Sequence, residues 1–288
     1  MWIFNKIVIG TAQFGMPYGI ANQNGQVCQD EIIAILDLSR ENGISALDTA
    51  KAYGSSEEAI GNYIKNYPEK SWEIITKISD SNNRLSDQLQ DSIHKLTVHP
   101  TSVLAHSAEL FLNEEFQSEL AGAIENQLIN KTGVSLYSED EIKQVLESTF
   151  KLDVIQLPMN ILDTRLYRSR ILSQLYEKGI EIHIRSAFLQ GLFYLPETEL
   201  NKRFSDALPY LAKLKSIAAE SDLTLAELSL LWLISLEEVS KVVTGVDNAS
   251  QLKAHLQTLN KNVDTSVFEE ALSIHYDNEN VLNPSLWS

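Results

Sequence analysis

Short apolar runs alternate with amphipathic segments along the whole chain. Eight of these runs have the length and composition of buried strands, and each precedes a helical pattern or a loop that leads into one. The predicted strands are 6–11, 44–48, 72–77, 102–106, 132–135, 154–156, 181–185 and 241–244. Strand–helix alternation predicts a parallel sheet covered by helices. Eight such units in 288 residues favour an α/β fold of the closed (β/α)8 TIM-barrel type, in a single domain.

Helix boundaries agree with this alternation. The capping-box pattern, Ser or Thr followed three residues later by Glu, occurs at 55–58, 138–141 and 224–227. Gly43 and Gly179 follow helical patterns, where a left-handed residue commonly ends a helix. We therefore expect a helix to begin at each of the three boxes and to end at each of the two glycines.

Two segments are longer than a minimal strand–helix unit requires. One is the connection 191–208, and the other is the polar C-terminal tail, which ends in Leu286, Trp287 and Ser288. Long loops on a barrel are usually functional or disordered. The apolar end of a polar tail predicts that Trp287 docks onto the protein.

Composition narrows the class of protein. A net charge of −16 without a basic patch argues against nucleic acids and anionic membrane surfaces as partners. The one cysteine, Cys28, excludes an intramolecular disulfide, and we interpret it as a solvent-shielded thiol near a helix start. No Cys/His pair has metal-ligand spacing, so no metal site is expected.

The expected cellular location follows from the absence of a recognisable membrane-spanning segment or signal peptide. No stretch approaches the about 20 apolar residues that a membrane-spanning helix needs. The N-terminus has neither the basic start nor the apolar run of a signal peptide. We expect a cytoplasmic protein without a membrane partner.

Polar side chains end three of the predicted strands, and a tyrosine follows one of them. Asp48, Lys77 and His106 terminate apolar runs, and Tyr53 comes five positions after Asp48. In a parallel barrel all four converge on the C-terminal rim, where barrels place their chemistry. A tyrosine is a weak acid, with an ordinary pKa of about 10, and a neighbouring ammonium stabilises its phenolate.

These four residue types together suit delivery of a proton to a carbonyl oxygen. Tyr53 would be the general acid beside Lys77, Asp48 would hold the lysine protonated, and His106 would orient the carbonyl. Each residue alone has a commoner structural explanation, as a helix cap, a packing tyrosine, a solvated lysine or a rim histidine.

The chain resembles the aldo-keto reductase family in segments that occur in the family's order over nearly its whole length. They are GTAQFG at 10–15, DTAKAYG at 48–54, TK at 76–77, LAHS at 104–107, GVS at 133–135, QLPMN at 156–160 and GL at 191–192. The resemblance implies reduction of an aldehyde or ketone to an alcohol, with a small-molecule carbonyl substrate. It implies the same roles for Asp48, Tyr53, Lys77 and His106. It also implies that a C-terminal loop, about 276–288, shapes the substrate pocket, for which Tyr18, Phe193, Tyr194 and Trp287 are candidates.

The expected cofactor is NADPH, with NADH possible. No strand–GxGxxG–helix unit indicates a Rossmann-type site, so the resemblance implies an extended cofactor across the barrel mouth. Ser135 and Gln156 fall where the family binds the nicotinamide amide, residues 185–191 where it binds the pyrophosphate, and residues 243–255 where it binds the adenosine. The residues implied are Gly10, Thr11, Ala12, Gln13, Ser135, Gln156, Arg185, Ser186, Phe188, Leu189, Gln190, Gly191, Thr244, Gly245, Val246, Asn248, Gln251 and His255.

The chain departs from the family's pattern in this region. Leu136 replaces an asparagine, Arg185 an aromatic residue that stacks on the nicotinamide, and His255 an asparagine at the adenine. Gly245 and Gln251 replace the basic residues of NADPH-selective members, and recognition of a 2′-phosphate normally relies on Arg or Lys. Lys253 is nearby in the sequence, so the preference between NADPH and NADH stays open.

Two other functions compete with carbonyl reduction. A cofactor-binding sensor or subunit with little turnover would share the cofactor segments but would not need the acid Tyr53. A glycoside hydrolase would need two carboxylates close together on the rim, and only Asp48 clearly ends a strand. The sequence leaves the oligomeric state and the physiological substrate open.

Overall fold

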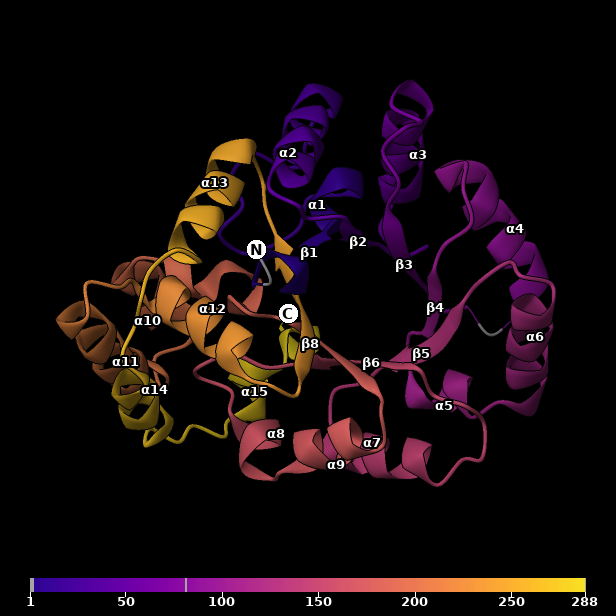
Figure 1. Ribbon diagram of the computed structural model, residues 1–288. Coiled ribbons are helices and arrows are strands. Elements are labelled where there is room, and N and C mark those ends of the chain that lie inside the picture. Colours follow the sequence, from indigo (N-terminus) through magenta and orange to yellow (C-terminus); the bar gives the residue numbers. More distant parts are fainter. Residues whose placement is uncertain (1–2, 81, 288) are drawn as a thin grey trace.

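In the computed structural model, which describes residues 3–80 and 82–287, eight parallel strands close into a barrel in sequence order (Figure 1). The strands are β1 Ile7–Gly10, β2 Ala46–Asp48, β3 Glu73–Ile78, β4 Ser102–Ala105, β5 Lys131–Ser135, β6 Val154–Pro158, β7 Glu181–Arg185 and β8 Val239–Gly245. Each strand pairs with its two neighbours, and β8 closes the barrel against β1. The predicted (β/α)8 barrel in one domain is confirmed.

Helices surround the barrel and connect its strands (Figure 1). The α-helices are α1 Ala12–Gly15, α2 Gln29–Glu41, α3 Ser56–Asn66, α4 Leu85–Leu96, α5 Ala108–Phe111, α6 Glu114–Glu125, α7 Glu139–Leu146, α8 Arg165–Arg168, α9 Ile171–Glu177, α10 Glu197–Arg203, α11 Leu208–Glu220, α12 Leu225–Ser235, α13 Ala249–Thr258, α14 Thr265–Leu272 and α15 Glu279–Leu282. The described residues also form three 3₁₀ helices, Ile3–Lys6, Leu189–Tyr194 and Pro284–Leu286. The long connection 191–208 is therefore mostly helical.

Both faces of the strands are buried, which explains why the strands read as continuous apolar runs. One face fills the barrel with a small cluster formed by Val8, Ala46, Ile75, Leu104 and Val154. The other face, which includes the neighbouring residues Ile7 and Ile9, belongs to the larger core packed beneath the helices. Successive side chains of a strand point to opposite faces, so β1 serves both clusters, with Val8 in the inner one and Ile7 and Ile9 in the outer one.

Two of the three predicted capping boxes are confirmed, at Ser138 and Thr224. At Ser55 the predicted helix start is confirmed, since Ser55 is the N-cap of α3, but the capping box is absent, because the Ser55 side chain makes no cap bond and instead accepts from the Gln26 side chain at 2.9 Å. The first residues of α3 form hydrogen bonds with residues in or next to the barrel strands. Ser56 Oγ donates to the carbonyl of Thr11 at 2.8 Å, and this tertiary contact prevails over the local pattern. Gly43 and Gly179 have φ of 79° and 73° at helix ends, as predicted.

The interpretation of Cys28 as solvent-shielded is wrong, although its place at a helix start is confirmed. Cys28 lies at the N-cap of α2 in extended backbone, and its side chain is exposed. The preceding residue, Val27, is the buried one, and its N–H donates to the carbonyl of Gln13 at 2.8 Å. In an extended segment adjacent side chains face opposite ways, so only one of the two can be buried.

The predicted docking of the C-terminal tail is confirmed for Trp287. Its ring lies 4.9 Å from that of Phe204, and its indole N–H donates to the carbonyl of Val281 at 3.1 Å. Ser288, like Met1, Trp2 and Ser81, lies outside the described residues.

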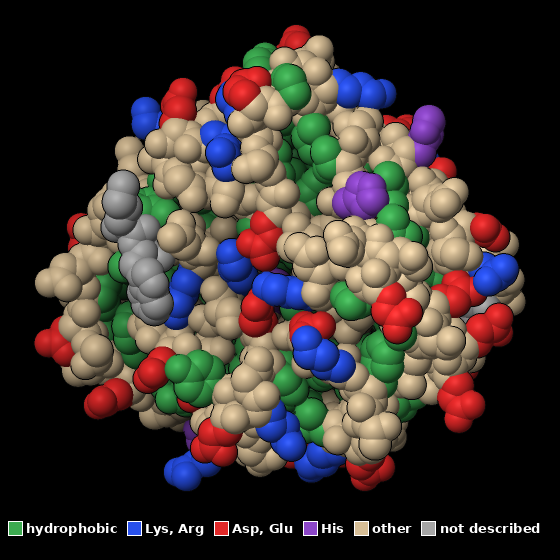
Figure 2. Space-filling model, turned by 45° about the vertical axis from the view of Figure 1, so that its right-hand side comes forward, with side chains coloured by type: hydrophobic (Ala, Val, Ile, Leu, Met, Phe, Trp, Pro, Cys, Tyr) green, Lys and Arg blue, Asp and Glu red, His purple; other side chains and the backbone are tan. Residues whose placement is uncertain are grey.

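The molecular surface mixes charges of both signs. On the face in Figure 2, lysine and arginine side chains lie among acidic ones rather than in one patch. Within residues 3–80 and 82–287, none of the helices combines the length and apolar character that crossing a membrane requires. In the same residues, no three His, Cys, Asp or Glu side chains are grouped so as to hold a metal ion.

Candidate active site

A cavity of about 680 Å³ opens at the C-terminal ends of the strands. Tyr53 and His106, which follow β2 and β4, line it, and so do Gln251 and Thr258 on α13. The parallel arrangement explains this convergence, because every strand ends at the same rim. Tyr53, the predicted proton donor, and many of the predicted cofactor residues therefore line the same cavity.

A buried ion pair lies beside the cavity, which Asp48 lines. Lys77 Nζ lies 2.5 Å from Asp48 Oδ1 and also donates to the carbonyl of Thr49 at 2.9 Å. The other carboxylate oxygen of Asp48 accepts from Gln156 Nε2 at 2.7 Å. Burial acts to lower the pKa of Lys77, but Asp48 and Tyr53 outweigh it and raise that pKa above the ordinary value. The lysine is therefore a charged ammonium at neutral pH.

The Tyr53 hydroxyl lies at the cavity end of this pair. Lys77 Nζ donates to it at 3.4 Å and lies 5.0 Å from the centre of the phenol ring. The end of α1 approaches the loop after β2 closely and fixes the tyrosine backbone: a Cβ added at Gly15 would lie 1.7 Å from the Tyr53 carbonyl oxygen. Gly15 is thus required next to the loop that carries Tyr53.

The His106 ring meets that of Tyr53 edge-on, with centroids 6.5 Å apart. Burial, together with the positive charges of Lys77 and Arg185, lowers the pKa of His106 to about 4. The imidazole is therefore neutral at physiological pH and carries one N–H. Its ring nitrogens form no hydrogen bond with the part of the chain that the structure describes, so that N–H is free to donate to a ligand.

Most of the predicted cofactor residues line the cavity. Those that do are Gly10, Thr11, Ala12, Gln13, Gln156, Arg185, Ser186, Phe188, Gln190, Gly191, Gly245, Gln251 and His255.

Five predicted cofactor residues do not line the cavity. Leu189 and Val246 are buried in the hydrophobic core. Thr244 Oγ1 donates to the carbonyl of Val8 at 3.5 Å, and Asn248 caps the N-terminus of α13. Ser135 lies at the rim, but its hydroxyl accepts from Arg185 Nε at 3.3 Å.

Six further lining residues belong to the predicted segments 185–191, 243–255 and 276–288 without having been singled out there: Ala187, Val243, Asp247, Ala254, Pro284 and Ser285. The remaining lining residues were not identified from the sequence: Gly19, Ala21, Asn22, Tyr137, Thr224, Ala226, Glu227, Leu230 and Thr258. Tyr137 and Asp247 each come two residues after a strand end, so their position on the rim was a usable signal. Thr224 and Glu227 had been interpreted only as a capping box. Of the pocket candidates, Tyr18 and Tyr194 line the cavity, whereas Phe193 is buried and Trp287 packs on Phe204.

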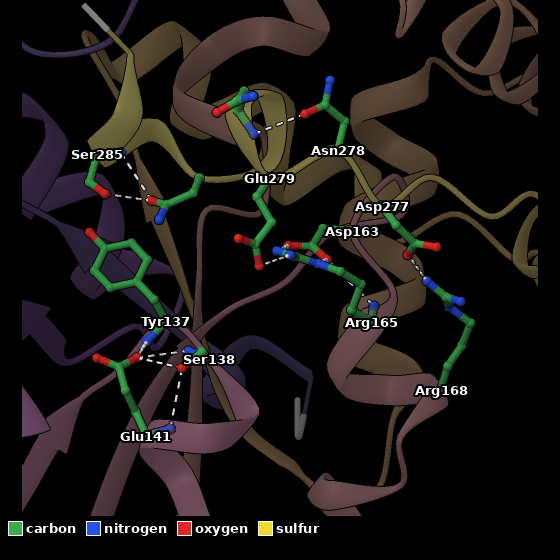
Figure 3. Close-up of polar contacts among 12 residues, drawn as sticks. Tyr137, Ser138, Glu141, Asp163, Arg165, Arg168, Asp277, Asn278, Glu279 and Ser285 are labelled. Atoms are coloured by element: carbon green, nitrogen blue, oxygen red, sulfur yellow. Dashed lines mark hydrogen bonds and ion pairs between the residues drawn. The ribbon is translucent and has the colours of Figure 1, made fainter.

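The C-terminal tail contributes one wall of the cavity through Pro284 and Ser285. Figure 3 shows the Tyr137 ring directed toward the segment that carries Ser285. Ion pairs hold the tail to α8: Arg165 lies 2.9 Å from Glu279, and Arg168 pairs with Asp277 (Figure 3). The wall is therefore anchored on the barrel rather than free.

The part of the cavity formed by β8 and α13 is acidic and aromatic. Asp247 Oδ1 is buried and has no hydrogen-bond partner among the described residues, and the His255 ring packs 4.8 Å from Phe188. Burial lowers the pKa of His255 to about 4, so this imidazole is neutral as well. Lys253 is exposed and is not among the lining residues.

The sequence model of the aldo/keto reductase family matches residues 6–275. The chain belongs to the aldo/keto reductase family. Membership of this family makes the protein an NAD(P)-dependent oxidoreductase. The predicted family and the predicted class of cofactor are therefore confirmed.

Among characterised relatives, the NADH-specific methylglyoxal reductase of Escherichia coli is 23% identical, with 90% of this chain and 91% of that protein covered. A probable voltage-gated potassium channel subunit beta of Arabidopsis thaliana is 23% identical over 87% and 88% of the two chains.

Solved structures share the fold. A holo-form aldo-keto reductase of Bacillus halodurans superposes with a TM-score of 0.75 at 20% identity, covering 95% of this chain and 94% of that one. An aldo/keto reductase of Klebsiella pneumoniae, solved with NADP and acetate, gives 0.72 at 15% identity over 96% and 94%.

Proposed function

We propose that the protein reduces an aldehyde or ketone to an alcohol, with a nicotinamide dinucleotide as the hydride donor and Tyr53 as the proton donor. The observation that carries the proposal is the buried Lys77 ammonium, 2.5 Å from Asp48 and 3.4 Å from the Tyr53 hydroxyl, both of which line the cavity. Family membership and the reductases among the relatives support it.

The residues at the rim fit the proposed cofactor. Gln156 Oε1 is buried, belongs to a residue that lines the cavity, and has no hydrogen-bond partner among residues 3–80 and 82–287. An unpaired buried acceptor is costly, and a carboxamide N–H from a ligand would satisfy it. Ser135, the last residue of β5, is paired in register with Gln156 in the middle of β6. When bound, the cofactor supplies the hydride for carbonyl reduction.

The chain's own residues would move the proton. The Tyr53 O–H bond breaks and the proton passes to the carbonyl oxygen, leaving a phenolate that the Lys77 ammonium stabilises. Asp48 keeps that ammonium charged and in place, and it is itself held by Gln156. His106, neutral because of its lowered pKa, donates its N–H to the same oxygen and orients the carbonyl.

A cofactor-binding subunit with little turnover is the alternative. The relative named as a channel subunit supports it. The intact arrangement of Tyr53, Lys77 and Asp48 argues against it, because a protein that only binds the cofactor does not need a proton donor. Multiple-turnover reduction of a model aldehyde distinguishes the two.

We expect the protein to bind a reduced nicotinamide dinucleotide without a metal ion. The reason is the cavity with its unpaired amide acceptor, together with the lack of any described His, Cys, Asp or Glu cluster that can hold a metal. Titration of tryptophan fluorescence with NADPH and with NADH should saturate equally with and without a chelator. Absence of binding up to millimolar concentration would contradict both the reductase and the binding-subunit proposals.

We expect weak discrimination between NADPH and NADH. Arg185 is the one Lys or Arg among the lining residues that the structure describes, and the β8–α13 part of the cavity presents Asp247 instead. A charge-assisted hydrogen bond contributes roughly 1.5–3 kcal/mol, so a missing basic partner costs about tenfold or more in selectivity. Dissociation constants for both cofactors at low and high salt measure this selectivity.

A variant tests whether Asp247 contributes. Asp247→Asn should improve the affinity for NADPH relative to NADH, because it removes a negative charge that repels the 2′-phosphate. Glu69→Gln, at an exposed position before β3 on the opposite end of the barrel, is the matched control and should change neither constant. A large NADPH preference of the wild type that disappears with salt would mean that a basic residue reaches the phosphate.

A further inference from the structure

The segment 186–191 follows β7 and lines the cavity, except for Leu189, which is buried in the hydrophobic core. The backbone φ angle is positive at four of its residues: 62° at Ser186, 48° at Leu189, 52° at Gln190 and 93° at Gly191. For residues other than glycine, this left-handed conformation costs free energy and persists only where the surroundings impose it. The shape of the segment therefore depends on contacts from outside it.

Two buried side chains outside the segment hold its first two carbonyl groups. Asn160, in the loop after β6, donates from Nδ2 to the Ser186 carbonyl at 3.2 Å. Ser229, on α12, donates from Oγ to the Ala187 carbonyl at 2.8 Å. Asn160 is 1% exposed and Ser229 is 0% exposed, and neither lines the cavity. They can therefore influence a ligand in the cavity only through the segment.

Ser229 bonds differently from another buried helical serine of this protein. A serine inside a helix commonly donates to the carbonyl four residues earlier, as Ser39 does to Ile35 on α2 at 2.7 Å. The Ser229 hydroxyl instead donates to Ala187 and accepts from the Ile161 N–H at 3.2 Å. It thereby links the loops that follow β6 and β7. A buried hydroxyl is costly unless it is hydrogen-bonded, and both hydrogen bonds of this one go to loops at the cavity rim.

The later residues of the segment are attached to other elements. The Gln190 carbonyl accepts from the N–H of Ile20, in the loop after α1, at 2.9 Å. The Phe188 ring lies 4.8 Å from that of His255 on α13. The hydrogen bond from Ser229 is therefore the attachment of this segment to α12, at the residue that precedes Phe188.

We propose that Ser229 is a positioning residue for the cofactor, which holds the segment 186–191 in its binding shape before the cofactor binds. A segment that is already ordered loses less conformational freedom on binding, so the affinity is higher. Without the hydroxyl, the Ala187 carbonyl and the Ile161 N–H are left unpaired, and the segment samples shapes in which the cofactor site is incomplete. The inference rests on the proposed function, since it takes this segment as part of the cofactor site.

Ser229→Ala should weaken the binding of NADH about tenfold in a fluorescence titration and raise the rate of NADH dissociation in stopped-flow experiments. Because Ser229 touches no reacting group, KM for NADH should rise more than kcat changes. Ser229→Cys keeps a similar volume with a weaker donor and acceptor, so its affinity should fall between those of wild type and Ser229→Ala. If Ser229→Cys bound as wild type while Ser229→Ala bound weakly, packing would set the affinity and the proposal would be overturned.

Ser39→Ala is the matched control, because Ser39 is equally buried in a helix, bonds within that helix and does not line the cavity. It should leave the NADH dissociation constant within about threefold of wild type, even if unfolding in denaturant shows a similar loss of global stability in both variants.

Hydrogen exchange of the cofactor-free proteins gives a second measurement. The Leu189 and Gly191 amides bond within the segment, to the carbonyls of Ser186 and Phe188. They should exchange about tenfold faster in Ser229→Ala than in wild type, and at the wild-type rate in Ser39→Ala. Equal exchange in all three proteins would mean that Ser229 does not hold the segment.

Binding and exchange separate this inference from the proposed function, because neither measurement requires turnover. If no carbonyl compound is reduced but Ser229→Ala binds NADH more weakly and its segment exchanges faster, the proposed function fails and the positioning role stands. If wild type reduces aldehydes and Ser229→Ala binds NADH equally well, the positioning role is overturned and the proposed function is unaffected.

Discussion

Replacing Tyr53 by phenylalanine is expected to lower kcat for reduction of a model aldehyde by about 10²–10⁴-fold, the usual contribution of a general acid. The variant loses the hydroxyl that Lys77 contacts at 3.4 Å and keeps the ring. Because the hydroxyl acts in the transition state, the loss should appear in turnover and not in binding. The cofactor dissociation constant, measured by fluorescence, should therefore stay nearly unchanged.

Tyr176→Phe is the matched control for this experiment. Tyr176 lies exposed on α9 and its hydroxyl contacts Glu237 at the surface, so its loss should leave turnover unaltered. If Tyr53→Phe retained most of the activity while Tyr176→Phe behaved as wild type, Tyr53 would not be the proton donor.

Lys77→Met is expected to remove activity and also to destabilise the fold by about 3–5 kcal/mol, the usual consequence of breaking a buried ion pair. The substitution leaves the carboxylate of Asp48 buried, with Gln156 as its remaining side-chain partner. An uncompensated charge in the barrel interior costs more than the lost contact itself. Equilibrium unfolding in denaturant measures the difference in the free energy of unfolding.

Two further variants separate charge from packing in this experiment. Adding Asp48→Asn to Lys77→Met should restore much of the stability, because it removes the unpaired charge, while activity stays absent. Lys143→Met breaks a surface pair with Glu139 on α7 and should change stability little. Equal instability of the single and double Lys77 variants would mean that packing, not the buried charge, governs this position.

The sequence by itself determined the architecture and the approximate place of the chemistry. All eight strands were predicted within a few residues, because both faces of a barrel strand are buried and the apolar run is then continuous along the chain. The order of strands and helices dictates that Asp48, Lys77 and His106 end at one rim. The positions of the strands and the rim at which each strand ends depend only on local composition and chain direction, and both can be read from the sequence.

The tertiary structure decided which side chains face the interior and which hydrogen-bond partners they have. Cys28 and Val27 are adjacent and both apolar enough to be buried, and only the packing of the loop on Gln13 selects Val27. Lys253 stands on α13 between Gln251 and Ala254, which line the cavity, yet Lys253 itself is exposed and does not line it. Ser55 had the local pattern of a cap, but contacts from the barrel to the first residues of α3 prevailed.

The shape and lining of the cavity depend on contacts between segments that are far apart in the sequence. Ser135 is covered by the side chain of Arg185 from β7, and Ser285 comes to face Tyr137 through ion pairs between the tail and α8. Periodicity predicts which elements form, since it reflects burial of each element's own faces. Which side chain occupies a given point in space depends on contacts between residues far apart in sequence, and their energies arise only when the barrel has closed.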